Sequence, residues 1–389
     1  MRNSFQFFDI NSQLIFLSIV LPSAAILNYA FGLGSIASVL MLLPTLLIFL
    51  YIVVTMFRAQ RHRIFSYYFV SIFFVFFILF IANTAVSEDK FMTSVKFFSF
   101  FSYLTYAYLQ FKLLKRKMSL RVLSIAINIS LLIFLAFAYD AINSTYVGQT
   151  VGMYAGVGVI LSLLSHSTLK EKGLYSLLPI FMLILSGSRG SLLIVGMLLA
   201  FASIFMIKKK LFWKGVFLVA IMSVFIRPDI IILNSFTSKI LYADRSTQES
   251  LLISAIQRSE RAVYGMQVFS EKPILGIGVG SDIGGKMYRY LGKKQTPHNG
   301  YVTVLVEGGY LLALPTFLFI LIGSLKIIYR AGKNSSNLTF AAALYILYYL
   351  ARALGENYLL YNFGNLVSII FIFIIVQGVF YKGDELLKS

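Results

Sequence analysis

Apolar stretches about as long as a lipid bilayer is thick recur along most of this chain. A helix needs about 20 apolar residues to cross a hydrocarbon core of about 30 Å. Inside a bilayer every backbone polar group must be paired within the protein, so such stretches fold as helices. The sequence therefore predicts an all-α fold, a polytopic helical bundle with twelve membrane spans: 13–33, 35–57, 64–86, 92–113, 119–140, 150–168, 173–188, 190–208, 211–227, 299–326, 338–355 and 361–381.

The composition supports a membrane protein over a nucleic-acid-binding one. Hydrophobic residues make up 59% of the chain, against about 45–50% in soluble domains. The net charge of +19 comes from short basic clusters between apolar stretches, a pattern that the positive-inside rule explains without a nucleic-acid partner. The chain has no cysteine, which excludes disulfides and thiolate metal sites.

The charged clusters predict the orientation of the bundle. Basic clusters at 58–63, 112–117, 169–172, 208–214 and 329–333 follow alternate spans, whereas the acidic segment at 87–90 falls between them. Because Lys and Arg gather in cytoplasmic loops, we expect a multi-pass protein with both termini in the cytoplasm. The stretch at 13–33 is too long for a typical signal peptide, so it is expected to be a retained helix.

One long loop divides the chain into three parts. It runs from Pro228 to Pro297 and holds nine Lys or Arg against six Asp or Glu. A loop of this length is functional or disordered, and the helical pattern of its second half favours order. The expected division is helices over 1–227, a partly helical catalytic loop on the outer face over 228–298, and helices over 299–389.

His298 is the strongest candidate for a catalytic residue. The other two histidines, His62 and His166, read as interfacial residues. His298 follows Pro297 at the start of the span 299–326, where the positive end of a helix dipole lowers a histidine's pKa. A neutral imidazole can accept a proton from a hydroxyl. The alternative is that His298 only caps the helix.

Three arginines on the same outer face could bind phosphate groups. Arg189 interrupts apolar sequence in "GSRGSLL", where it could meet a lipid phosphate or simply snorkel to the interface. Arg258 and Arg261 are three residues apart, hence on one face of a helix. The glycine-rich turn at 276–280 has no βαβ context, so a nucleotide site is not expected.

Other charged residues have simpler interpretations. Arg352 and Glu356 are one helical turn apart and are expected to form an ion pair, and Lys96 is expected to extend outward or to meet a phosphate. The sequence has no HExxH motif, no DxD pair and no paired acids on the outer face, so neither a metal nor a cofactor is predicted. One histidine with several arginines suits transfer from a pyrophosphate donor, with arginines neutralising the leaving diphosphate.

The motifs between 187 and 312 resemble those of a known family. "SRGSLL", then "KPILGIGVG", then "PHNGYVTVLVEGG" are similar to the signature of the O-antigen ligase and O-antigen polymerase superfamily, which are bacterial inner-membrane glycosyltransferases of the GT-C class. The resemblance implies a GT-C-like fold with a large periplasmic loop. It also implies inverting, metal-independent transfer of a glycan from undecaprenyl diphosphate to a sugar hydroxyl at the periplasmic face.

The resemblance also assigns residue roles. His298 matches the catalytic histidine, with Asn299 beside it. Arg189 and Arg258 match the arginines that bind the diphosphate, and Arg261 is an alternative register for the second of them. The remaining supporting residues are Glu307 of the "EGG" motif, Arg352 and Glu356.

Three activities fit these motifs to different degrees. A polymerase of lipopolysaccharide biosynthesis, favoured by the "PHNGY" form and the Phe-, Ile- and Lys-rich composition, joins repeat units that are still linked to the lipid. A ligase moves the finished polymer onto lipid A–core. A lipid-linked oligosaccharide flippase would place charges along a central cavity, whereas here they gather on one face. Expected partners are the undecaprenyl-diphosphate-linked oligosaccharide, the lipid bilayer and a chain-length regulator.

Overall fold

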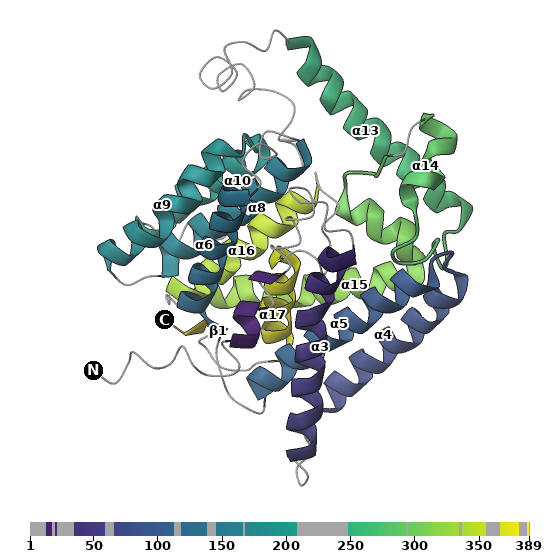
Figure 1. Ribbon diagram of the computed structural model, residues 1–389, viewed down its shortest axis with the longest axis horizontal. Coiled ribbons are helices and arrows are strands. Elements are labelled where there is room, and N and C mark those ends of the chain that lie inside the picture. Colours follow the sequence, from purple (N-terminus) through teal and green to yellow (C-terminus); the bar gives the residue numbers. More distant parts are fainter. Residues whose placement is uncertain are drawn as a thin grey trace.

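The computed structural model is built almost wholly of α-helices (Figure 1). It describes residues 13–17, 20–21, 35–58, 66–112, 118–137, 145–165, 168–207, 248–292, 295–333, 337–354, 366–380 and 387–388. The elements are α3 (Ser35–Arg58), α4 (Tyr67–Val86), α5 (Lys90–Lys112), β1 (Met118–Ser119), α6 (Leu120–Phe137), α8 (Thr145–Ser165), α9 (Leu169–Leu185), α10 (Arg189–Ile207), α13 (Gln248–Glu271), α14 (Ile283–Leu291), α15 (Gly300–Lys333), α16 (Asn337–Ala353), α17 (Leu366–Phe380) and β2 (Leu387–Lys388).

The helices confirm the all-α prediction. α3 to α6, α8 to α10 and α15 to α17 each overlap one predicted span. Most of the span 13–33 and all of 211–227 lie outside the described residues. Within the described part, α4 and α15 are long and apolar enough to cross a membrane, and six other helices carry shorter apolar stretches of 10–17 residues. The number of twelve spans stays a prediction.

α17 forms the centre of the helix bundle (Figure 1). It packs against α5, α15, α16 and α8, and its side chains from Ser368 to Gln377 are buried. In a bilayer, helices associate through close packing because lipid tails are as apolar as the side chains. Gly323 and Gly378 allow such an approach, since a Cβ at Gly378 would lie 2.7 Å from the Gly323 oxygen.

Phenylalanines hold α4 and α5 together. Phe80 meets Phe97, Phe100 and Phe101 with ring centroids 5.2 to 5.9 Å apart, in tilted, stacked and edge-on arrangements. Such pairs contribute roughly 0.5–1.5 kcal/mol each beyond the area that they bury. The high phenylalanine content of the chain, 37 residues, therefore serves helix packing as well as contact with lipid.

The connections at one end of the bundle agree with the predicted alternation of spans. β1 pairs in parallel with β2 and so places the C-terminal residues beside the segment that follows the 112–117 cluster. At helix ends assigned to the same face, the Ser66 amide donates to the Tyr108 hydroxyl and Lys326 donates to the Val379 oxygen. The cytoplasmic assignment of this face stays a prediction.

Candidate functional site

Helix α15 is interrupted at Gly309, where the sequence had predicted one continuous span. Gly309 has φ 60° and ψ −173°, which divides α15 into two shorter helices. The segment 272–281 fills this interruption, and its backbone pairs with the exposed ends of both halves. The Ile277 amide donates to Val306 O, and the Tyr310 amide donates to Pro273 O. Helix ends that are buried must find such partners because they have no access to water.

One glycine of "KPILGIGVG" and one of "EGG" make this contact possible. Gly276 and Gly309 both have positive φ values, and a Cβ on Gly276 would lie 2.4 Å from the Glu307 oxygen. A Cβ on Gly309 would lie 2.3 Å from the Ile274 oxygen. The two motifs therefore form one packing unit, in which backbone meets backbone.

Asn83 joins this unit to α4. Its side-chain Nδ2 donates to Leu275 O at 2.8 Å and to Glu307 O at 2.9 Å, and its Oδ1 accepts from the Val279 amide at 2.7 Å. Asn83 is only 1% exposed. No sequence motif pointed to Asn83, although a lone amide side chain within the apolar span 64–86 was a signal that it had a partner.

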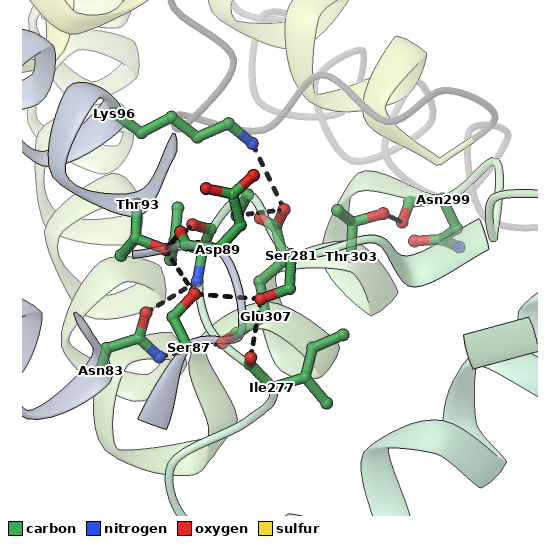
Figure 2. A network of polar contacts seen from close by, with 12 residues as sticks. Asn83, Ser87, Asp89, Thr93, Lys96, Ile277, Ser281, Asn299, Thr303 and Glu307 are labelled. Atoms are coloured by element: carbon green, nitrogen blue, oxygen red, sulfur yellow. Dashed lines mark hydrogen bonds and ion pairs between the residues drawn. The ribbon is translucent and has the colours of Figure 1, made fainter. Parts of the chain in front are cut away.

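Glu307 is the charged centre of the interruption (Figure 2). Its Oε1 accepts from the Gly280 amide at 2.9 Å and from Lys96 Nζ at 3.4 Å. Glu307 is 5% exposed. Lys96 thus pairs with Glu307, a partner that was not among those expected for it, because a buried carboxylate strongly favours a nearby cation.

Hydroxyl groups extend the same network to the start of α5 (Figure 2). Thr93 Oγ1 donates to Val279 O at 2.6 Å and lies 2.7 Å from Ser87 Oγ, which in turn lies 3.1 Å from Ser281 Oγ. Outside this core, Lys286 forms an ion pair with Glu88. The turn between α4 and α5 is therefore bound to the segment 272–286, both of which the sequence places on the outer face.

Asn299, and not His298, caps the first helix of α15. The Asn299 Oδ1 accepts from the amides of Tyr301 at 3.0 Å and Val302 at 3.1 Å, the arrangement of an N-cap residue. His298 precedes the cap with φ 48° and is half-buried. The capping role considered for His298 therefore belongs to Asn299, whose side chain stabilises the start of α15.

Helix α13 lies against the segment that carries His298. The predicted helical stretch of the long loop is confirmed as part of Gln248–Glu271. A Cβ at Gly265 would lie 2.8 Å from Val302 Cγ1 and 3.0 Å from Pro297 Cγ. Arg261 is four residues before Gly265 and Arg258 seven, so both positions share its face of the helix. Arg261 is half-buried, and the Arg258 side chain lies outside the described part.

Arg189 is the first residue of α10, directly after the tight turn at the end of α9. Gly187 in this turn has φ 58°. Ser188 Oγ donates to Ser191 Oγ at 3.1 Å, and the Tyr348 hydroxyl of α16 donates to the same Ser191 oxygen at 3.1 Å. The Arg189 side chain lies outside the described part, but its backbone position is tied to α16 through Ser191.

The end of α16 connects these candidate positions. Two residues after Tyr348, the Leu350 oxygen accepts from the Tyr301 hydroxyl of α15 at 3.1 Å. Arg352, four residues after Tyr348, is buried. Four residues of α-helix rise only about 6 Å, so the structure brings the backbone of Arg189, the start of α15 and Arg352 to one end of the bundle. Glu356, the expected partner of Arg352, lies outside the described residues.

Residues 174–317 match the family model described as O-antigen ligase. The chain carries an O-antigen ligase family domain. The matched range covers the turn before Arg189, helix α13, the glycine-rich segment and the interruption in α15. It confirms the resemblance of the motifs at 187–312 to the superfamily of O-antigen ligases and polymerases. Comparison with curated proteins gave no match.

The O-antigen ligase family match supports the superfamily of O-antigen polymerases and ligases without separating the two. Together with the apolar helices, it also supports insertion into a bacterial membrane. Within the described residues, no group of three or more His, Asp or Glu side chains is placed to hold a metal ion.

Replacing Asn83 with leucine should destabilise the protein by about 3 kcal/mol, because buried backbone groups of Leu275, Val279 and Glu307 would lose a partner. Thermal unfolding of the purified protein in detergent measures this loss. Thr84→Val is the matched control, since the Thr84 hydroxyl donates to the Phe80 oxygen of its own helix and its loss should change stability little. Equal melting temperatures for Asn83→Leu and Thr84→Val would contradict the assigned clamp.

Proposed function

We propose that this protein is an O-antigen polymerase that extends surface polysaccharide. It transfers a glycan from undecaprenyl diphosphate to a sugar hydroxyl of another lipid-linked repeat unit, at the periplasmic face of the inner membrane. The observation that supports this proposal is the grouping of Arg189, Arg352, the His298 segment and the Arg261 face of α13 at one end of a bundle that carries an O-antigen ligase family domain.

The proposed reaction is a single inverting displacement. The acceptor hydroxyl attacks the anomeric carbon of the donor sugar, and His298 takes the hydroxyl proton as general base. The bond between the anomeric carbon and the phosphate oxygen breaks, and undecaprenyl diphosphate leaves. Arg189 and either Arg258 or Arg261 bind the diphosphate and stabilise the charge that develops on it.

The grouping of the candidate residues favours an enzyme over a flippase. A transporter needs charged groups along a path across the bilayer. Here His298 and Arg352 lie near one end of α15 and α16 respectively, and the Tyr301–Leu350 contact joins those two ends. A lipid-linked diphosphate lies at the membrane surface, so its base and its arginines should lie there too.

A deletion of the gene in its host, followed by a gel of the surface polysaccharide, tests the proposal. If lipid A–core carries a single repeat unit, ligation works and chains fail to grow, as expected for loss of a polymerase. If long chains accumulate on undecaprenyl diphosphate while lipid A–core stays bare, the protein is the ligase, and the polymerase proposal is overturned.

Replacing Arg189 with lysine should reduce transfer by roughly 10- to 100-fold, because a lysine ammonium cannot reproduce the two parallel hydrogen bonds of a guanidinium to phosphate. The polysaccharide gel of the complemented deletion strain, with protein abundance checked by immunoblot, measures the effect. Arg330→Lys, at the other end of α15, is the control and should leave the gel unchanged. Normal chain growth in Arg189→Lys would contradict the two parallel hydrogen bonds to phosphate. It would leave Arg189 with the role of a positive charge or a structural residue only.

A further inference from the structure

Helix α14 carries exposed aromatic and charged side chains near its C-terminal end. Tyr288 and Tyr290 are 53% and 40% exposed, and Arg289 between them is also exposed. Figure 1 shows α13 and α14 together at one edge of the molecule, where α13 also packs against α15. Tyrosines in such a position are available to a ligand from the aqueous side.

These side chains are held in fixed relative positions. The rings of Tyr264 on α13 and Tyr290 on α14 stack with centroids 6.2 Å apart and planes at 22°. Glu271 accepts from the Tyr290 hydroxyl at 2.5 Å and from Arg289 Nη2 at 3.0 Å. The hydrogen bond from Tyr290, followed by that from Arg289, holds the pKa of Glu271 below its ordinary value. The carboxylate therefore stays ionised and keeps acceptor capacity for further hydroxyl groups.

The cluster is also anchored beside the His298 segment. Tyr264 directly precedes Gly265, which contacts Pro297 and Val302. On the inner side of α14, Met287 belongs to a buried cluster with Val268 of α13 and Val306 of α15. A ligand held by these tyrosines would therefore lie on the same small unit that positions His298.

We propose that Tyr264, Tyr290, Arg289 and Glu271 form a binding site for a stretch of glycan. A sugar ring has an apolar face of C–H groups and a rim of hydroxyls. Tyrosine rings offer a rigid, flat apolar surface, and an adjacent carboxylate and guanidinium accept from and donate to the hydroxyls. That the glycan is a substrate of the His298 site rests on the proposed function.

Lipid headgroups are the competing ligand for exposed tyrosines, and the structure favours the glycan. The outward-facing apolar side chains that suit a bilayer follow one another along α15, at Leu311, Leu314 and Leu318. In the α14 cluster the Glu271 carboxylate pairs with the Arg289 guanidinium and accepts from the Tyr290 hydroxyl, so its one cation is neutralised and attracts anionic headgroups little.

Binding of delipidated surface polysaccharide to the purified full-length protein in nanodiscs tests the site. The polysaccharide comes from the host, carries a fluorescent label and lacks the diphosphate lipid. Wild type should bind saturably, and Tyr290→Ala should weaken binding about 10-fold, whereas Tyr290→Phe, which keeps the ring, should weaken it less. Tyr68→Ala is the matched control, because Tyr68 is 81% exposed at the start of α4, far along the chain from α14.

The outcomes separate this site from the proposed reaction. His298→Ala should bind the polysaccharide like wild type, because His298 is not part of the cluster. Unchanged binding by Tyr290→Ala, equal loss in Tyr68→Ala, or no saturable binding by wild type would each overturn the glycan site and leave the reaction proposal standing. If Tyr290→Ala binds normally but melts earlier in nanodiscs and not in detergent, the tyrosines contact lipid headgroups instead.

Discussion

Strains whose only copy of the gene encodes alanine at position 298 should make no polymerised surface polysaccharide. His298 is proposed to accept the proton of the attacking hydroxyl, and general bases contribute about 10²- to 10⁴-fold to a reaction rate. The same polysaccharide gel used for the deletion measures the result. The altered protein should still reach the membrane at wild-type abundance, since the N-cap of α15 is supplied by Asn299.

The backbone at position 298 calls for a second variant. His298 has φ 48°, a conformation that disfavours alanine, whereas asparagine adopts it more readily. His298→Asn therefore removes the imidazole with less strain and should be equally inactive. His62→Ala serves as the control histidine and should polymerise normally. Chain growth in His298→Asn at the wild-type level would remove the general-base role.

Replacing Gly309 with alanine should prevent stable folding, with a loss of roughly 3–5 kcal/mol. The backbone of Gly309 lies in a region that is almost exclusive to glycine, and the added Cβ would lie 2.3 Å from the Ile274 oxygen. The contacting atom is backbone, so it cannot move aside without breaking the pairing between segment 272–281 and α15. Protein yield in the membrane and the melting temperature in detergent measure the loss.

Gly196→Ala is the matched control for this substitution. Gly196 is an exposed helical residue of α10 with no atom within 4 Å of an added Cβ. Alanine there should stabilise the helix by about 0.4–1 kcal/mol. If Gly309→Ala were as stable as Gly196→Ala, the interruption of α15 and its filling by segment 272–281 would be wrong.

Much of this architecture could be predicted from local sequence. Apolar stretches of bilayer length predict helices because lipid leaves the backbone no other way to pair its polar groups. The helix over the second half of the long loop and the helix start at "PHNG" are likewise local properties, set by a 3.6-residue pattern and an Asn cap. The roles of Arg189, Arg258, Arg261 and His298 came from the family resemblance, and they stay proposals.

The sequence by itself determined that this chain forms apolar helices, and its motifs determined the family of the central domain. Only the tertiary structure decided how the motifs are used. The glycine-rich segment fills a break in α15, and Lys96 pairs with Glu307. Asn83 forms hydrogen bonds to the glycine-rich segment and to α15. The physical reason is distance along the chain. Asn83 and Glu307 are 224 residues apart, and no local pattern encodes which buried polar group will satisfy another across such a separation.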